Sequence, residues 1–384
     1  MLLAVAAAAW LVAVVLILPL GYGRDNDSYL MLHTWQRMAH DGIYMPSRNP
    51  SFPFAEFAIG STAAIGGAWL SNLLIATCAA TTAVLAYILA LKLEVARPAL
   101  VTALFLASPV IMVQSATSID YMIAFSCLLG GMVLILHGRV LPGVILLAVS
   151  VGTRMPMLFY AGFFLWLMAR QRTVEGLRFV EAFAVLFFVS GLFYLPAWIH
   201  NSLGFGWITA SWIEDQGMLA WLARLAVKPT RIFGLIPSIA AVGLLAVLWW
   251  RGRLALPWRS SFATRLSLVM CLITVAIYMR LPTDVAYMIF AIPFLGILLV
   301  ECNAVPVLDL LVAGGLLTAV VEVEPLVILS KDGDECGWLV RSARISPHFV
   351  AGPVLAEIQG HDLGERCGRQ WLLIDYEDAN RPLP

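Results

Sequence analysis

Long apolar runs dominate the first 321 residues of this 384-residue chain. A helix needs about 20 apolar residues to cross a hydrocarbon core of about 30 Å, and most of these runs approach that length. They cover residues 1–20, 69–91, 98–116, 119–136, 140–153, 155–169, 179–199, 232–250, 266–279, 285–300 and 305–321. The pattern predicts an all-α polytopic membrane protein with about eleven transmembrane helices.

Two segments need a separate interpretation. Residues 1–20 have no basic region before them and no small-residue cleavage site at their end, so we expect a retained helix rather than a cleaved signal peptide. Residues 52–68 adjoin the second run, but Gly60, Gly66 and Gly67 weaken them as a span. We therefore expect 52–68 to be an interfacial or partly inserted helix.

The distribution of basic residues sets the expected orientation. If the N-terminus is inside and 52–68 does not cross, most basic residues fall on cytoplasmic connections, as the positive-inside rule requires. These residues are Lys92, Arg97, Arg139, Arg170, Arg172, Arg178, Arg251, Arg253, Arg259 and Arg265. This distribution predicts an integral protein of a plasma membrane, such as a bacterial inner membrane, with the C-terminal tail facing the periplasm or exterior.

Composition supports the membrane class and excludes others. Apolar residues make up 61% of the chain and charged residues 12%, against about 25% charged residues in soluble domains. Basic and acidic residues both number 24, which gives no support for nucleic-acid binding. Acidic residues nevertheless gather at the predicted outer face, which indicates chemistry there: Asp25, Asp27, Asp41, Glu56, Asp120, Glu214, Asp215 and Asp284.

Residues 322–384 differ from the transmembrane domain 1–321, because their charge density returns to that of a soluble protein. Short apolar stretches such as 338–340 and 371–374 predict a small extracytoplasmic α+β domain. Cys336 and Cys367 are the cysteines of this tail. An oxidising compartment would permit a disulfide between them.

The first outer loop, residues 21–56, carries the most distinctive chemistry. Asp25 and Asp27 stand two residues apart before a helical stretch that ends near His40. The two carboxylates could hold Mg²⁺ or Mn²⁺ or position a nucleophile, but Asp27 could equally be the N-cap of the helix. That helix is amphipathic, which fits either a position in the membrane interface or packing against spans.

Several motifs together resemble the GT-C superfamily, which includes the dolichyl-phosphate-mannose protein mannosyltransferases and the lipid A aminoarabinose transferases. The resemblance covers roughly residues 1–321. It rests on the acidic pair with Tyr29, Gly42-Ile43-Tyr44, Pro53-Phe54, Gly152-Thr153-Arg154-Met155-Pro156, and Arg280-Leu281-Pro282 with Tyr287 and Pro293. Asn26 stands where many relatives have Glu, and the tail resembles nothing in that family.

The resemblance implies transfer of a sugar from a polyprenyl-phosphate carrier to a lipid, glycan or protein acceptor on the outer face. Asp25 aligns with the first carboxylate of the family motif and would be the general base, while Asp27 would bind a divalent cation or the acceptor. Arginines suit the carrier phosphate, although helix-end arginines also snorkel. The expected binding residues are Arg24, Tyr29, Arg48, Glu56, Arg154, Arg280 and Tyr287, with Asp120, His200, Glu214 and Asp284 as further candidates.

Two other functions stay open. A transporter or flippase of lipid-linked substrates would need polar groups at mid-membrane, and the predicted spans hold almost no charge there apart from Asp309. A non-catalytic GT-C-like subunit of a larger assembly is also compatible, because a fold does not fix a function.

Overall fold

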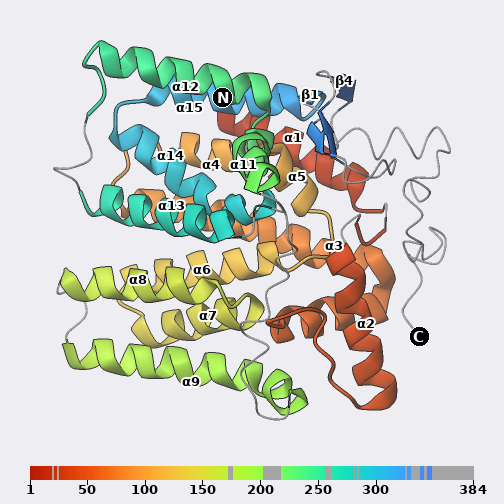
Figure 1. The fold of residues 1–384 in the computed structure, drawn as a ribbon. Helices are drawn as coiled ribbons and strands as arrows, with labels where there is room; N and C mark the ends of the chain where they lie inside the picture. Colours follow the sequence, from red (N-terminus) through yellow and green to blue (C-terminus); the bar gives the residue numbers. More distant parts are fainter. Residues whose placement is uncertain are drawn as a thin grey trace.

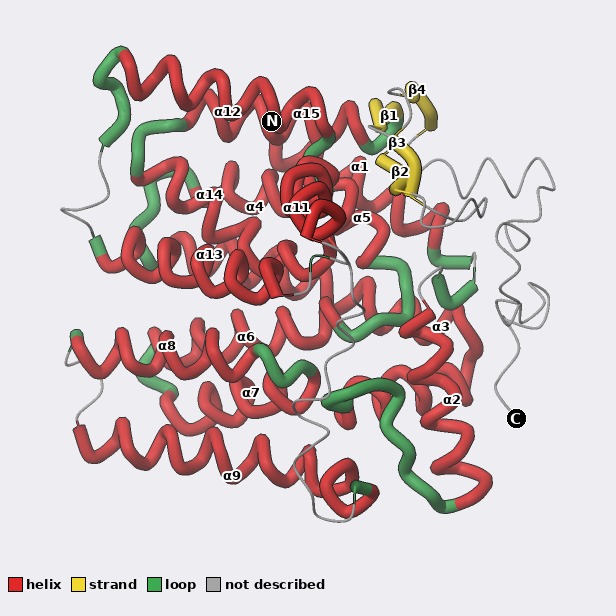
Figure 2. Tube along the Cα trace, viewed as in Figure 1, coloured by secondary structure: helices red, strands yellow, loops and turns green. Residues whose placement is uncertain are grey.

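The computed structural model describes residues 1–19, 21–23, 26–171, 176–201, 218–255, 261–280, 282, 285–324, 327–329, 338–340 and 344–347. This part of the chain is predominantly helical (Figures 1 and 2). The helices are α1 (Leu2–Ile17), α2 (Asn26–Asp41), α3 (Pro53–Lys92), α4 (Pro98–Ala107), α5 (Pro109–Gln114), α6 (Tyr121–Leu136), α7 (Val140–Thr153), α8 (Met157–Arg170), α9 (Gly176–His200), α11 (Met218–Val227), α12 (Leu235–Trp250), α13 (Phe262–Arg280), α14 (Ile292–Glu301) and α15 (Val305–Thr318), with 3-10 helices η1 (Lys228–Ile232) and η3 (Val285–Ala291).

Many of the helices lie side by side with similar axis directions, so the bundle has two ends (Figure 1). At one end, on the left of the view, lie the C-terminal ends of α8 and α12 and the N-terminal ends of α9 and α13. At the other end lie α2 and the short strands. We call this the α2 end, and the candidate site is built there.

Glycine lets α6 and α7 pack closely. A Cβ atom on Gly131 would lie 2.7 Å from the carbonyl oxygen of Gly143, and one on Gly143 would lie 2.5 Å from Ile135 Cγ1. Lipid tails are as apolar as side chains, so close packing of small residues, rather than escape from water, brings such helices together. The closely packed α6–α7 pair thereby fixes the positions of Asp120, just before α6, and Arg154, just after α7.

Helix α3 is broken where the sequence predicted a division. Gly66 and Gly67 have non-helical backbone angles, and Gly67 has φ of +62°, a conformation that favours glycine. The first arm of α3 packs against α2, where a Cβ on Gly60 would lie 2.2 Å from Trp35 Cβ. That 52–68 does not cross the membrane stays a prediction.

A buried amide fastens the loop after α1 to the rest of the α2 end. Asn72 on α3 donates to the carbonyl oxygens of Leu18 at 3.0 Å and Gly21 at 2.7 Å. Its own oxygen accepts from Ser118 Oγ at 2.7 Å, and the Ser118 backbone N–H donates to Tyr22. The segment that leads into α2 is therefore held against the α5–α6 connection.

Helices suited to a membrane are present, which confirms a helical membrane protein. Three described helices are long and apolar enough to cross: Pro53–Lys92, Arg178–His200 and Phe262–Arg280. Arg224–Ile232 and Leu235–Trp250, bent by 97°, add a fourth if the pair is one span. The remaining apolar helices have 10–17 residues, so the predicted count of about eleven crossings stays a prediction.

The described parts of the tail are short strands. Strands β1 (Val321–Glu324) and β4 (Arg344–Pro347) pair antiparallel, as do β2 (Val327–Leu329) and β3 (Trp338–Val340). The predicted α+β domain over 322–384 lies largely outside the described residues. So do Cys336 and Cys367, and their disulfide stays a prediction.

Candidate functional site

Four charged side chains of alternating sign meet at the α2 end. Asp27 lies in the first turn of α2, Arg48 in the loop before α3, Asp120 at the N-cap of α6, and Arg154 just after α7. Arg48 pairs with Asp27 through Nη1 and with Asp120 through Nη2, at 2.9 Å. Arg154 Nη1 lies 2.8 Å from the other oxygen of Asp120. We call Asp27, Arg48, Asp120 and Arg154 the ionic chain.

Exposure changes steadily along the ionic chain. The side chains of Asp120 and Arg154 are 0% and 2% exposed, whereas those of Arg48 and Asp27 are 13% and 33% exposed. A buried charge is tolerated only with a partner, and Asp120 supplies it for both arginines. The Asp27 end is therefore the end that a ligand can reach first.

Aromatic rings surround the two arginines. The Arg154 guanidinium carbon lies 3.9 Å from the Tyr121 ring centre, 5.1 Å from Tyr287 and 5.5 Å from Phe52. The Arg48 carbon lies 4.2 Å from the Phe52 ring centre. Cation–π contacts of this kind stabilise guanidinium groups that have left water, so Phe52 serves both arginines.

A second buried acid lies in the first turn of α3. The Glu56 carboxylate is 0% exposed and accepts hydrogen bonds from Tyr44 Oη, from the backbone N–H and Oγ of Ser47, and from the Phe52 N–H. Burial raises the pKa of Tyr44, and the charge of Glu56 raises it further. Tyr44 is therefore a neutral donor. We call Glu56, Tyr44, Ser47 and Phe52 the Glu56 cluster.

The structure brings together several residues singled out in the sequence. The ionic chain contains Asp27, Arg48 and Arg154, and the Tyr287 ring lies against Arg154. Glu56 accepts hydrogen bonds from Ser47 and Phe52, on either side of Arg48 in the sequence. Other candidates lie elsewhere: Tyr29 stacks edge-on against Tyr22 at 6.4 Å, and Arg280 and His200 are exposed at the ends of α13 and α9. Arg24, Asp25, Glu214 and Asp284 lie outside the described residues.

The sequence did not identify every residue of this arrangement. Asp120 was only a further candidate, yet it links the two arginines, and Tyr121, Phe52, Tyr44 and Ser47 were not selected. A sequence signal for Asp120 exists, because this acid stands at the start of the apolar run 119–136, at its predicted outer end. That signal does not reveal the partners of the carboxylate.

The expected cation site at Asp27 involves Asp25, which lies outside the described residues. Among them, no group of three or more His, Cys, Asp or Glu side chains could hold a metal ion. Arg48 already neutralises the Asp27 carboxylate. A cation site that includes Asp25 stays a prediction, and no chemical step below depends on a metal.

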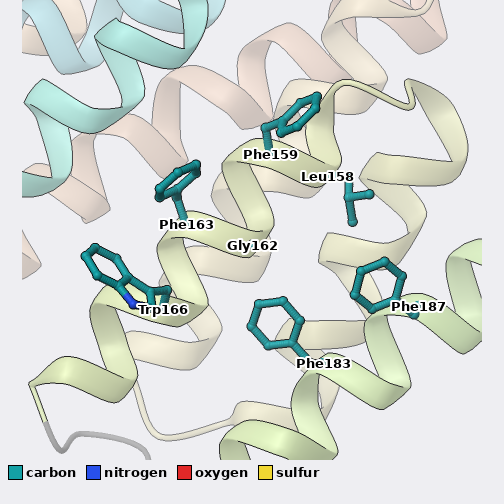
Figure 3. Close-up of a pocket in the computed structure, with 7 residues that line it drawn as sticks. All are labelled: Leu158, Phe159, Gly162, Phe163, Trp166, Phe183 and Phe187. Carbon is teal, nitrogen blue, oxygen red and sulfur yellow. The ribbon is translucent and has the colours of Figure 1, made fainter.

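An apolar groove of about 310 Å³ runs between α8 and α9 (Figure 3). One end of the groove is at Leu158, four residues after Arg154, and the groove extends along α8 to Trp166. Gly162 leaves room opposite Phe183, since a Cβ there would lie 3.9 Å from the ring. The lining residues are Leu158, Phe159, Gly162, Phe163, Trp166, Phe183 and Phe187.

Comparison with known proteins identifies a similar fold. No family model and no curated protein matches the sequence. The structure of ArnT from Cupriavidus metallidurans bound to undecaprenyl phosphate is similar, with 14% identity and a TM-score of 0.50 over 77% of this chain and 58% of that one. Its apo structure gives 15% identity and a TM-score of 0.49 over 77% and 57%.

The chain spans less than two thirds of the length of ArnT. ArnT is a GT-C lipid A aminoarabinose transferase, and at this identity the similarity concerns the fold. It agrees with the resemblance found in the sequence motifs. The chain therefore shares its fold with the aligned part of ArnT.

Proposed function

We propose that this protein is a membrane glycosyltransferase that moves a sugar from a polyprenyl-phosphate carrier to an acceptor at the outer face of the membrane. The observation that carries the proposal is the ionic chain at the α2 end of a GT-C fold. Binding of undecaprenyl phosphate by the structurally similar ArnT supports it. The site would face the periplasm if the host is a bacterium.

The reaction needs a base and a stabilised leaving group. An acceptor hydroxyl attacks the anomeric carbon, its proton passes to a carboxylate, and the bond between that carbon and the carrier phosphate oxygen breaks. Asp25 is the proposed base. Arg48 is the proposed first contact of the phosphate, because it lies at the accessible end of the ionic chain and a guanidinium can bind phosphate bidentately.

Arg154 has a different proposed role from the one expected of it. Its guanidinium is buried, paired with Asp120 and enclosed by aromatic rings. It is therefore suited to hold Asp120, which in turn orients Arg48. Arg280 is exposed on the last turn of α13, and a contact with the phosphate remains a proposal for that residue.

The groove between α8 and α9 supports a place for the isoprenoid tail. The lining of the groove is apolar, and the groove begins at Leu158, close in sequence to Arg154 of the ionic chain. Gly162→Leu would place a side chain in the groove, where a Cβ atom meets only ordinary contact with Phe183 at 3.9 Å, and Gly243→Leu on α12 is a matched control because nothing lies within 4 Å of a Cβ atom there. We expect Gly162→Leu alone to weaken undecaprenyl-phosphate binding.

The decisive experiment measures sugar transfer from a polyprenyl-phosphate donor by purified, lipid-reconstituted protein. Asp25→Asn should lower turnover by about 10²–10⁴-fold, with donor binding largely retained. If Asp27→Asn abolishes turnover while Asp25→Asn keeps it, the base is Asp27. If the wild type transfers no sugar from any donor found in the host membrane, the role of a non-catalytic subunit replaces the enzyme.

A further inference from the structure

The Glu56 cluster is built around a carboxylate that has no access to solvent. Two bonds are short, from Tyr44 Oη to Oε2 and from Ser47 Oγ to Oε1, both at 2.5 Å, and the Ser47 N–H donates to Oε1 at the ordinary distance of 2.9 Å. The Phe52 N–H adds a longer one at 3.4 Å. Four donors converge on this one carboxyl group, so Glu56 fixes the segment that supplies them.

All of these donors come from the segment 44–52, and they flank Arg48 on both sides. Tyr44 and Ser47 precede Arg48, and Phe52 follows it while stacking on its guanidinium at 4.2 Å. With the backbone held on either side, the Arg48 side chain has little freedom except toward Asp27 and Asp120. The carboxylate thus acts on Arg48 without touching it in any bond that the structure shows.

We propose that Glu56 is a positioning residue: it anchors the segment 44–52 so that Arg48 reaches Asp120 and presents its guanidinium to the phosphate of a polyprenyl carrier. This inference rests on the proposed function. It differs from the sequence-based expectation that Glu56 binds substrate directly. Both oxygens of Glu56 accept hydrogen bonds from the segment 44–52, and the side chain is fully buried.

The hydrogen-bond geometry predicts which substitutions the cluster tolerates. In Glu56→Gln, the amide oxygen can keep both Ser47 bonds, and the amide nitrogen can donate to Tyr44. The Tyr44 hydroxyl can still donate to Ser51 Oγ, which lies 2.6 Å away. Glu56→Ala loses every bond. A positioning role therefore predicts rescue by Gln, whereas a direct electrostatic or proton-transfer role does not.

The test measures binding of undecaprenyl phosphate to the full-length protein in lipid nanodiscs. Arg48→Ala and Glu56→Ala should each weaken binding by roughly tenfold or more, because the first removes the charge-assisted contact between Arg48 and the phosphate and the second removes the anchor that positions Arg48 for it. Their combination should weaken binding no further, since both act through Arg48. Glu56→Gln should stay within about threefold of the wild type.

Glu301→Ala is the matched control. That carboxylate accepts from Ser261 Oγ at 2.7 Å and Thr264 Oγ1 at 3.2 Å, between the C-terminal end of α14 and the N-terminal end of α13. Its loss should leave carrier binding unchanged. If Glu56→Ala does not fold, Tyr44→Phe and Ser47→Ala remove single donors and should weaken binding by smaller factors.

A second readout does not need the carrier. Phenylglyoxal modification of Arg48, followed by peptide mass spectrometry, should be slow in the wild type and in Glu56→Gln and faster in Glu56→Ala. Wild-type protein that does not bind the carrier would overturn the proposed function, while this readout would still test the anchor. Equal modification rates in all three proteins, or Glu56→Gln as damaging as Glu56→Ala, would overturn the positioning role.

Discussion

Replacement of Asp120 by Asn tests whether the ionic chain stabilises the α2 end. The substitution keeps the size of the side chain but removes the negative charge that pairs with Arg48 and Arg154. In the wild type the ionic chain holds two acids and two arginines and is formally neutral. In the variant two guanidinium groups would face each other with Asp27 as the remaining acid, and Arg154 would keep a buried charge without an anion.

The contact distances give the size of the effect. At 2.8 and 2.9 Å, each pair contributes a Coulomb attraction of about 6 kcal/mol at an effective dielectric constant of about 20. Desolvation offsets much of this, and removal of one partner from a buried pair costs about 3–5 kcal/mol. We therefore expect Asp120→Asn to lower the free energy of unfolding by about 3–5 kcal/mol.

The assay is reversible unfolding in mixed micelles, followed by tryptophan fluorescence. Arg154→Met should restore part of the stability when it is added to Asp120→Asn, because it removes the unpaired buried cation. The coupling energy between the two substitutions should exceed about 1 kcal/mol. Additive effects, or an Asp120→Asn variant as stable as the wild type, would refute the reasoning that these charges form a buried pair.

The remaining predictions use simpler measurements. In a cysteine-free background, Asp41→Cys should react with an impermeant thiol reagent from outside and Arg139→Cys only from inside, since both positions are exposed; the reverse pattern would invert the topology. The mature protein should show a Cys336–Cys367 disulfide without added oxidant, and two free thiols would exclude it. Gly131→Ala should lower the free energy of unfolding by about 1–3 kcal/mol, because the new Cβ atom would lie 2.7 Å from the carbonyl oxygen of Gly143 on α7. Chelation of divalent cations tests the predicted cation site at the acidic pair: loss of sugar transfer would support that site, and unchanged transfer would exclude it.

The apolar pattern predicted many helices well but not their breaks. The run 140–153 coincides with α7, and the run 119–136 with α6 apart from its first residues. The run 98–116 is divided at Ser108, whose hydroxyl donates to the Ile232 carbonyl at 2.8 Å. Hydrophobicity reports where a segment is buried, whereas this break lies directly before Pro109, since the residue before a proline is disfavoured in the helical conformation.

The site shows the same limit in its polar residues. Resemblance to a family selected Asp27, Arg48 and Arg154, because each stands in or near a motif of that family. It did not show that Arg48 and Asp120, 72 residues apart, are partners. Which acid meets which arginine depends on how α2, α3, α6 and α7 converge, and a sequence pattern carries no information on that distance.

The difference in burial along the ionic chain bears directly on the proposed chemistry. Asp120 and Arg154 are almost fully buried. If a ligand displaced either one from the other, a buried charge would be left unpaired. Arg48 and Asp27 are 13% and 33% exposed, so this pair is the part of the ionic chain that a phosphate would reach first. A phosphate that replaced Asp27 would supply Arg48 with the negative charge it needs. That exchange would also release the Asp27 carboxylate from Arg48, so binding of the donor phosphate and release of this acid would be coupled in one step.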